Sequence, residues 1–307
     1  MVYDIIIFLH GLQWLPIIQI YCFSLYLLIN FMYFTTSAPD VIISRIRFSQ
    51  GFRKGGKMLS VRNITKSFGA NRILDGIDLD VDKGDVTVIL GPSGSGKTTL
   101  LRCMDFLETP DSGTMDYDDI HIDYTDVRKK EILKVRRKTG FVFQNYNLFS
   151  NKTALQNVTE GLITVRKRDR REAESIAKEA LDKVGLKDLY ERYPSALSGG
   201  QCQRVGIARA IAFSPEIIFF DEPTSALDPE LVGGILAILK QLAREDTTMV
   251  IVTHEMSFAS EAANHVIFME NGKIIEQGSP DRVFRHPEME RTRQFLRLIT
   301  KDYDYSI

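Results

Sequence analysis

The sequence contains little cysteine and almost no net charge. It has three cysteines in 307 residues, with no CxxC pair and no metal-ligand spacing. Such a small, odd number argues against a disulfide framework or a structural zinc site, and it suits a reducing compartment. The formal net charge is −1, which gives no indication of a nucleic-acid partner. Internal repeats and low-complexity linkers are also missing from a chain long enough for one large or two ordinary domains.

Acidic and basic residues are absent from one long stretch near the N-terminus. Residues 5–34 contain no Asp, Glu, Lys or Arg, and about 20 apolar residues suffice to span a bilayer. The basic residues between Arg45 and Lys57 would keep the rest of the chain on the cytoplasmic side, so one interpretation is a single membrane anchor. The second is a mis-assigned start, with translation beginning at Met58, because residues 54–57 can be encoded by a purine-rich ribosome-binding stretch. In either case, we expect residues 1–57 to carry no chemistry.

Residues 91–98, GPSGSGKT, match the phosphate-binding pattern G-x-x-x-x-G-K-[ST]. The run 85–90 predicts a buried strand before them, and residues 98–104 can form a helix after them. A strand, a glycine-rich turn and a helix N-terminus direct backbone N–H groups at one point, where a polyphosphate can bind. Lys97 would reach the β- and γ-phosphates, and the Thr98 hydroxyl would bind Mg²⁺. The predicted phosphate-binding residues are Gly91, Pro92, Ser93, Gly94, Ser95, Gly96, Lys97, Thr98 and Thr99.

Two carboxylates follow an apolar strand predicted at residues 217–220. A strand this apolar is typical of a parallel sheet covered on both faces, and such sheets carry their ligand sites at the carboxyl ends of the strands. Asp221 would hold Mg²⁺ through water, and Glu222 would polarise the attacking water as a general base. A second apolar strand, residues 249–252, leads to His254 at the same edge of the sheet, where we expect a contact with the γ-phosphate.

A second anion site is predicted at residues 197–201, LSGGQ, before a helix that extends to about residue 213. Ser198 is a favourable N-cap, and Gly199 and Gly200 expose N–H groups at the helix N-terminus. Because one phosphate loop already supplies a nucleotide cradle, the simplest explanation is that this site serves a nucleotide bound by another copy of the chain. A further helix, predicted at residues 170–184, follows a basic run, residues 166–171, which we interpret as its solvated entry rather than a nucleic-acid patch.

Phe68 precedes a glycine turn in a strand-rich segment, residues 59–81. In the second half of this segment, residues 77, 79 and 81 are apolar and alternate with aspartates, which predicts one buried and one solvent-facing side. Phe68 could stack on an adenine ring or be an ordinary core aromatic, and the presence of the phosphate loop favours stacking.

Taken together, these motifs resemble those of an ABC-transporter ATPase subunit. GPSGSGKT, Gln144, LSGGQCQR (197–204), FFDEPTSALDPE (219–230) and VTHE (252–255) occur in that family's order and spacing, and the resemblance covers residues 59 to about 300. LSGGQ is the specific element, since many ATPases and GTPases share the phosphate loop. The residues at 108–113, 145–149, 193–197 and 290–296 are similar to those of the branch that imports polar amino acids such as glutamine, histidine and arginine.

The resemblance implies an α/β fold, with a RecA-like P-loop core, an N-terminal antiparallel β subdomain and a helical subdomain inserted near residues 146–195. The ATPase domain would cover residues 58–300, followed by a tail at 301–307. The resemblance also implies ATP and Mg²⁺ as cofactors, and a head-to-tail homodimer that holds two ATP molecules, each between one chain's phosphate loop and the other's LSGGQ. It assigns Gln144 to the metal and nucleotide sites, and it adds to the nucleotide site Ser198, Gly199, Gly200, Gln201 and Asp228.

In such a system the segment after Gln144 passes motion to separate integral-membrane permease subunits at the cytoplasmic face of the cell membrane. An extracytoplasmic solute-binding protein belongs to the same system, and no nucleic acid is expected. The chain departs from the family pattern at Cys202, which stands where a second Gln is usual, and at residues 150–151, Ser-Asn, which replace Pro-His where the permease is expected to bind. An importer of another small solute is the alternative. A soluble ABC ATPase outside transport is less favoured, because the chain has neither a second nucleotide-binding domain nor a long coiled-coil insertion.

Overall fold

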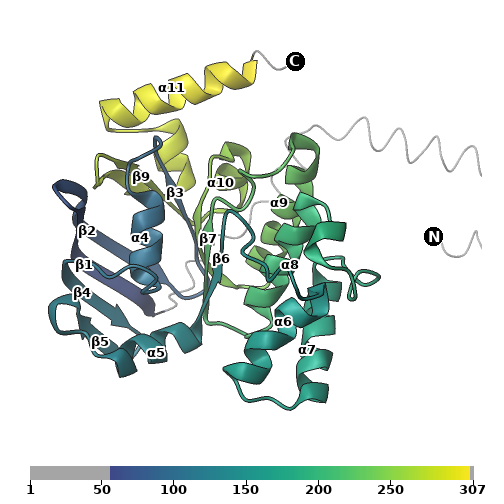
Figure 1. The fold of residues 1–307 in the computed structure, drawn as a ribbon. Helices are drawn as coiled ribbons and strands as arrows, with labels where there is room; N and C mark the ends of the chain where they lie inside the picture. The colour runs from purple at the N-terminus through teal and green to yellow at the C-terminus, as the bar shows by residue number, and fades with distance from the viewer. Residues whose placement is uncertain (1–55, 305–307) are drawn as a thin grey trace, which may run out of the picture. The chain divides into compact units, whose positions relative to one another are not determined.

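The computed structural model describes residues 56–304. The two interpretations of residues 1–57 therefore fall outside the described residues, apart from Gly56 and Lys57, and so do residues 305–307 of the expected tail. None of the helices within residues 56–304 has the length and apolar character needed to cross a membrane. Two sheets organise this part of the chain, one largely parallel and one antiparallel (Figure 1).

The larger sheet has six strands in the order β10-β9-β3-β8-β7-β6. Five of them run parallel, and β10 pairs antiparallel with β9 at one edge. Every residue of β3, β7 and β8 is buried, which confirms the strand predicted at 217–220 as covered on both faces and the apolar strands predicted at 85–90 and 249–252. The strands are β3 (Val86–Leu90), β6 (Thr139–Val142), β7 (Ile217–Asp221), β8 (Thr248–Val252), β9 (His265–Glu270) and β10 (Lys273–Gly278).

Alternate residues of the parallel strands face two separate hydrophobic clusters, because successive side chains of a strand point to opposite faces. On β7, Ile218 and Phe220 pack with the helices on one side, whereas Ile217 and Phe219 pack with the antiparallel sheet and helix α4 on the other. Figure 1 shows this division, with α8 and α9 across the sheet from β1 and β2. The helices named in this division are α4 (Lys97–Met104), α8 (Gly199–Ile211) and α9 (Pro229–Arg244).

The smaller sheet is the antiparallel β subdomain expected at the N-terminal side. Its four strands are ordered β2-β1-β4-β5. On β2 the side chains of Ile77, Leu79 and Val81 are buried, while the aspartates between them reach toward solvent, so the predicted alternation is confirmed. The strands are β1 (Lys57–Phe68), β2 (Asn71–Asp82), β4 (Ser112–Tyr117) and β5 (Ile120–Asp123).

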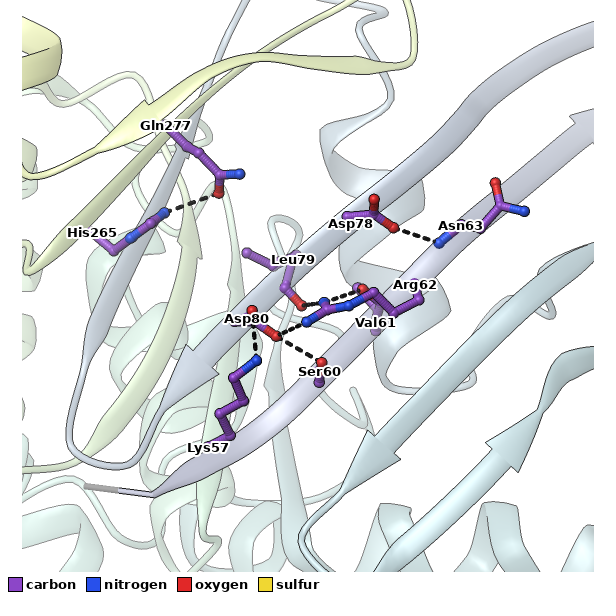
Figure 2. A network of polar contacts seen from close by, with 10 residues as sticks. All are labelled: Lys57, Ser60, Val61, Arg62, Asn63, Asp78, Leu79, Asp80, His265 and Gln277. Carbon is purple, nitrogen blue, oxygen red and sulfur yellow. Dashed lines mark hydrogen bonds and ion pairs between the residues drawn. The ribbon is translucent and has the colours of Figure 1, made fainter. Parts of the chain in front are cut away.

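Asp80 on β2 accepts hydrogen bonds from three side chains of β1 (Figure 2). Ser60 Oγ donates to Asp80 Oδ1 at 2.7 Å, Arg62 Nη2 donates to the same oxygen at 2.6 Å, and Lys57 Nζ donates to Oδ2 at 3.0 Å. Partial burial would raise the pKa of Asp80, but these three bonds outweigh burial and lower that pKa below its usual value. We refer to Lys57, Ser60, Arg62 and Asp80 as the Asp80 cluster.

The chain between β6 and β7 forms the expected helical insertion. It contains α6 (Ala154–Thr164), α7 (Arg170–Lys183) and the short helix η2 (Pro194–Ala196), and it leads into α8. Asp169 caps α7 by accepting from the N–H groups of Arg171 and Glu172 at 2.9 and 3.0 Å. Gly185, at φ 75°, follows the end of the helix. The helix predicted at residues 170–184 is therefore confirmed to within one residue.

The remaining elements connect and flank the two sheets. Helices η1 (Tyr124–Asp126) and α5 (Lys129–Lys138) lead from β5 to β6, and α10 (Met256–Ala262) leads from β8 to β9. Helices η3 (Asp281–Arg285) and α11 (Glu290–Asp304) follow β10. Phe295 of α11 packs on Phe268 of β9, with the ring centroids 4.8 Å apart, so α11 is attached to the larger sheet through β9.

Candidate functional site

The phosphate loop lies between β3 and α4, as predicted. Its backbone passes so close to two neighbouring segments that only glycine fits: a Cβ at Gly91 would lie 2.0 Å from the Met269 carbonyl oxygen, and one at Gly96 would lie 2.8 Å from the Ile73 carbonyl oxygen. Both glycines have positive φ values, 146° and 98°. No side chain caps the N-terminus of α4, so the N–H groups of its first turn remain available to bind phosphate oxygens.

Lys97 lies across this loop. Its Nζ donates to the carbonyl oxygens of Gly91 and Pro92, at 2.9 Å each, and the residue is 4% exposed. Burial lowers the pKa of Lys97, while the charges of Glu222 and Asp221 oppose this shift. The ammonium group is thus placed inside the loop and faces the two carboxylates at the end of β7, where the β- and γ-phosphates are expected.

Thr98 and Asp221 are 123 residues apart in the sequence and lie in contact in the structure. Thr98 Oγ1 donates to Asp221 Oδ1 at 2.7 Å, and Asp221 is 1% exposed at the end of β7. The other oxygen, Oδ2, is buried and has no hydrogen-bond donor among residues 56–304. Its nearest cation is Arg102 Nη2, at 3.6 Å. Burial raises the pKa of Asp221, although the hydrogen bond from Thr98 and the charge of Arg102 oppose this shift.

Glu222 follows Asp221 in a left-handed backbone conformation, with φ 46°. Its N–H donates to the Val252 carbonyl at 2.9 Å, which fixes the residue beside the end of β8. Its Oε1 lies 3.2 Å from His254 Nε2. The hydrogen bond with His254 lowers the pKa of Glu222 although partial burial opposes it, so the carboxylate is ionised at neutral pH. The two residues predicted to act on water and on the γ-phosphate therefore lie in contact.

LSGGQ forms the start of α8, and its predicted N-cap is confirmed. Ser198 N donates to Gln201 Oε1 at 2.9 Å, and Gln201 N donates to Ser198 Oγ at 3.3 Å, which is a reciprocal capping box. In the described part of the chain, no hydrogen bond or ion pair joins LSGGQ to the phosphate loop. Asp228 is the N-cap residue of α9 but makes no side-chain capping bond there. Its carboxylate is exposed and remains available.

Phe68 and Gln144 also lie at exposed positions. Phe68, at the end of β1, is 49% exposed, so the alternative of a core aromatic is wrong, and stacking on adenine stays a prediction. Lys66 Nζ lies 4.9 Å from the centroid of its ring. Gln144 is exposed in a turn two residues after β6. Since Val142 of β6 pairs with Phe220 of β7, this turn leaves the same edge of the sheet as Asp221.

Arg102 is a group of the site that was not predicted from the sequence, and Ser95 was predicted only as one residue of the phosphate loop. Arg102 lies one turn after Thr98 on α4, and this i, i+4 spacing could have indicated that it shares a face with the metal-binding hydroxyl. Ser95 Oγ is buried without a hydrogen-bond partner among the described residues, as is Asp221 Oδ2. No sequence signal distinguishes Ser95 from the other small residues of the loop.

The donor atoms at this edge of the sheet fit Mg²⁺ rather than a metal held by the protein alone. Within residues 56–304, no group of three or more His, Cys, Asp and Glu side chains could hold a metal ion. Thr98 and Asp221 offer one hydroxyl and one carboxylate, of which one oxygen has no hydrogen bond among residues 56–304. Mg²⁺ is usually bound by one or two protein oxygens together with substrate phosphates and water, so this set is suited to a magnesium–nucleotide complex.

Comparison with known proteins agrees with this geometry. The family model described as "ABC transporter" matches residues 74–225. The L-cystine import ATP-binding protein TcyC of Bacillus subtilis (strain 168) is 56% identical over 243 residues, which are 79% of this chain and 98% of that protein. The glutamine transport ATP-binding protein GlnQ of the same organism is 46% identical over 239 residues, 78% of this chain and 98% of that protein.

Solved structures show the same fold. The ATP-binding cassette MJ0796, in a dimeric post-hydrolysis state bound to ADP and Pi, superposes with a TM-score of 0.66 at 37% identity, covering 73% of this chain and 99% of that one. CbiO1 from Clostridium perfringens, part of the transporter complex cbiONQ, superposes with a TM-score of 0.67 at 32% identity and covers 82% of this chain and 99% of that one.

Proposed function

The chain belongs to the ABC transporter family, and on that premise we propose that it is the ATP-hydrolysing subunit of an importer for polar amino acids. The observation that carries the ATPase function is the pair formed by Thr98 and Asp221 beside a phosphate loop, with one buried carboxylate oxygen that has no hydrogen bond among the described residues. Support for the amino acid comes from relatives named for cystine import and for arginine and glutamine transport. All of these are matched over nearly their whole length.

The residues at the carboxyl edge of the parallel sheet divide the chemistry among them. The first turn of α4 and Lys97 bind the phosphates, while Thr98 and Asp221 would hold the metal. Mg²⁺, when bound, supplies positive charge to the β- and γ-phosphate oxygens. Glu222, kept ionised and oriented by His254, polarises the attacking water. Gln144 and Phe68 are proposed to contact the metal site and the adenine ring, respectively.

Domain limits and partners complete the proposal. The ATPase domain covers residues 58–300, with the helical insertion near 146–195. Two copies join head to tail, so that Ser198, Gly199 and Gly200 of one copy complete the nucleotide site of the other. Integral-membrane permease subunits hold the dimer at the cytoplasmic face of the membrane, and an extracytoplasmic solute-binding protein delivers the amino acid.

The proposed permease contact is a loop that the structure holds firmly. Asn157 of α6 is fully buried, and its Nδ2 donates to the carbonyl oxygens of Phe149, Lys152 and Thr153 at 3.0–3.1 Å. Its Oδ1 accepts from Phe149 N at 2.7 Å. This amide thereby fixes the loop that contains Ser150 and Asn151, and it leaves the Phe149 ring 47% exposed. An ordered loop with an exposed aromatic side chain is suited to binding a partner.

Reconstitution tests this function directly. The full chain would be combined with the permease and solute-binding proteins of a polar amino acid importer from the same organism, in vesicles with MgATP on the cytoplasmic side. We expect ATP-dependent uptake of at least one polar amino acid, and loss of that uptake with Glu222→Gln. ATP-dependent uptake of a sugar or an inorganic ion but of no amino acid would contradict the substrate class. No ATP-dependent uptake of any solute would contradict an importer.

A further inference from the structure

The backbone after β6, residues 143–147, lies along one stripe of α8. The stripe consists of Gly199, Gln203, Gly206 and Arg209, at i, i+4, i+7 and i+10, which lie on one face of a helix. Gln203 Nε2 donates to the Phe143 carbonyl at 3.4 Å, and a Cβ at Gly206 would lie 3.6 Å from the Tyr146 carbonyl oxygen. The helix that begins with LSGGQ therefore supports the loop that begins with Gln144.

Arg209 fixes the end of this loop. Its Nη1 donates to the Asn147 carbonyl at 2.7 Å, and its Nη2 donates to the Tyr146 carbonyl at 3.0 Å. Both residues have left-handed backbones, with φ 48° for Asn147 and 61° for Tyr146, which is unfavourable for residues with a Cβ. The Arg209 guanidinium holds this loop in an unfavourable backbone conformation. The loop therefore has one defined shape relative to α8.

The side chain of Tyr146 reaches the nucleotide-site motifs from this loop. Its hydroxyl donates to the Ala226 carbonyl at 3.1 Å, in the segment between Glu222 and Asp228. The same hydroxyl lies 2.8 Å from the position of a Cβ at Gly199, and Leu227 Cδ2 lies 3.4 Å from that position. One tyrosine thus touches LSGGQ and the segment that follows Glu222, while its backbone belongs to the loop that leads to Phe149.

We propose that Tyr146 is a positioning residue that joins the permease-facing loop to LSGGQ and to the segment after Glu222, so that the three move as one unit. The proposal rests on the function proposed above. Glycine at 199 is then required for a second reason besides its exposed N–H, because it leaves room for the Tyr146 hydroxyl. If a partner moves Phe149, the Tyr146 hydroxyl would transmit that movement, through its contacts with Ala226 and Gly199, to the site that hydrolyses ATP.

Tyr146→Phe tests this role, because it keeps the ring and removes only the bond to Ala226. In the reconstituted complex we expect the stimulation of ATP hydrolysis by solute-loaded binding protein to fall about fivefold, the scale of one neutral hydrogen bond. The KM for ATP and the melting temperature should stay at wild-type values. Tyr190→Phe is the matched control, since it also loses one hydroxyl bond, but to Asp182 of α7 rather than to the segment that follows Glu222. Equal stimulation in Tyr146→Phe and wild type would overturn the proposal.

A second measurement does not depend on the permease. The full chain carrying Glu222→Gln should dimerise with ATP, and Gly199→Ala should raise the ATP concentration needed, because its methyl group meets the Tyr146 hydroxyl. Adding Tyr146→Phe to Gly199→Ala should bring the ATP concentration needed for dimerisation most of the way back to its value with Gly199. If Gly199→Ala and Tyr146→Phe change the required ATP concentration independently of each other, the proposed contact between the two residues is wrong. If solute-loaded binding protein does not stimulate ATP hydrolysis by the wild-type complex, the proposed function is contradicted instead. The dimerisation of the Gly199→Ala and Tyr146→Phe variants would still decide the proposal about Tyr146.

Discussion

Asp80 and Asp221 are two aspartates in strands of the same domain, and their surroundings are opposite. The Asp80 carboxylate is 41% exposed and accepts hydrogen bonds from Ser60, Arg62 and Lys57. The Asp221 side chain is 1% exposed and accepts a single hydrogen bond, from Thr98, while its second oxygen has an ion pair with Arg102 at 3.6 Å but no hydrogen bond in the described structure. The pKa of Asp80 is lowered by its partners, and the pKa of Asp221 is raised by burial.

The difference separates a structural polar group from a functional one. A carboxylate with all its partners stabilises the fold and has no capacity left for a ligand. A buried carboxylate that lacks a partner destabilises the fold, and such groups gather where an external cation completes them. We therefore expect substitutions at the edge that carries Asp221 to change activity, and substitutions in the Asp80 cluster to change stability.

Glu222→Gln should give the largest effect on activity. The amide cannot polarise water, so the turnover number of ATP hydrolysis should fall by about 10²-fold or more, while ATP binding through Lys97 and Thr98 is retained. Asp80→Asn is the control and should keep wild-type turnover. Steady-state hydrolysis by Glu222→Gln within a few-fold of wild type would remove Glu222 from the role of general base.

Gly199→Asp should weaken ATP-driven dimerisation of the full chain carrying Glu222→Gln. The added carboxylate would be placed against the γ-phosphate where an N–H is expected to donate. Gly199→Asn is the matched control, because it has the same size and the same collision with Tyr146 but no charge. Sedimentation should show that Gly199→Asp weakens the dimer at least tenfold more than Gly199→Asn does, with ATP binding to the monomer unchanged in both. Loss of monomer binding would place LSGGQ in the site of its own chain.

Phe68→Ala should reduce ATP affinity by up to about tenfold, the scale of one aromatic stacking contact. Because the ring is 49% exposed, its removal should leave thermal stability nearly unchanged. Binding of ATP and of inorganic triphosphate can be compared by calorimetry. The loss should appear with ATP alone, and an equal loss with triphosphate would contradict stacking on the adenine.

Asp80→Asn should have the smallest effect, on stability alone. We expect a loss of a few tenths to about 1 kcal/mol in the free energy of unfolding, a range that allows for solvent screening of an exposed group. Since the folded pKa of Asp80 is lowered, its stabilisation is present above the unfolded pKa of about 3.9 and is lost as pH falls through the folded value. Denaturant unfolding of wild type and Asp80→Asn at pH 7 and pH 3 checks this. A difference in the free energy of unfolding that is larger at pH 3 than at pH 7 would contradict it.

Local features of the fold and the site could be predicted from the sequence. The strand at 85–90, the phosphate loop and the helix at 170–184 depend on short-range patterns of apolar residues, glycines and caps, and the structure has them at β3, α4 and α7. The edge shared by Lys97, Asp221 and His254 was predictable as well, because parallel strands bring their carboxyl ends to one side of a sheet.

Pairings between distant side chains could not be predicted. Arg102 approaches Asp221 across 119 residues, and Tyr146 reaches Ala226 across 80, and neither spacing has a sequence signature. The Asp80 cluster depends on the register of β1 against β2, which contains several irregular positions. The lack of a hydrogen bond to Asp221 Oδ2 among the described residues results from the packing around β7. The apolar sequence of the strand therefore predicted that Asp221 is buried, but not that this oxygen has no hydrogen-bond donor.

Thermal unfolding of wild type and Asp221→Asn, each with and without MgATP, tests the central claim most directly. Burial raises the pKa of Asp221, so its charged form is destabilising above the unfolded pKa of about 3.9, and the amide removes that penalty while it can still accept from Thr98. Without nucleotide at pH 7.5, the variant should therefore melt at or above the wild-type temperature. With MgATP, wild type should be stabilised and the variant much less, because binding free energy adds to the stability of the folded state. A variant that melts below wild type without nucleotide and gains as much from MgATP would contradict the claim that Asp221 is left incomplete for Mg²⁺.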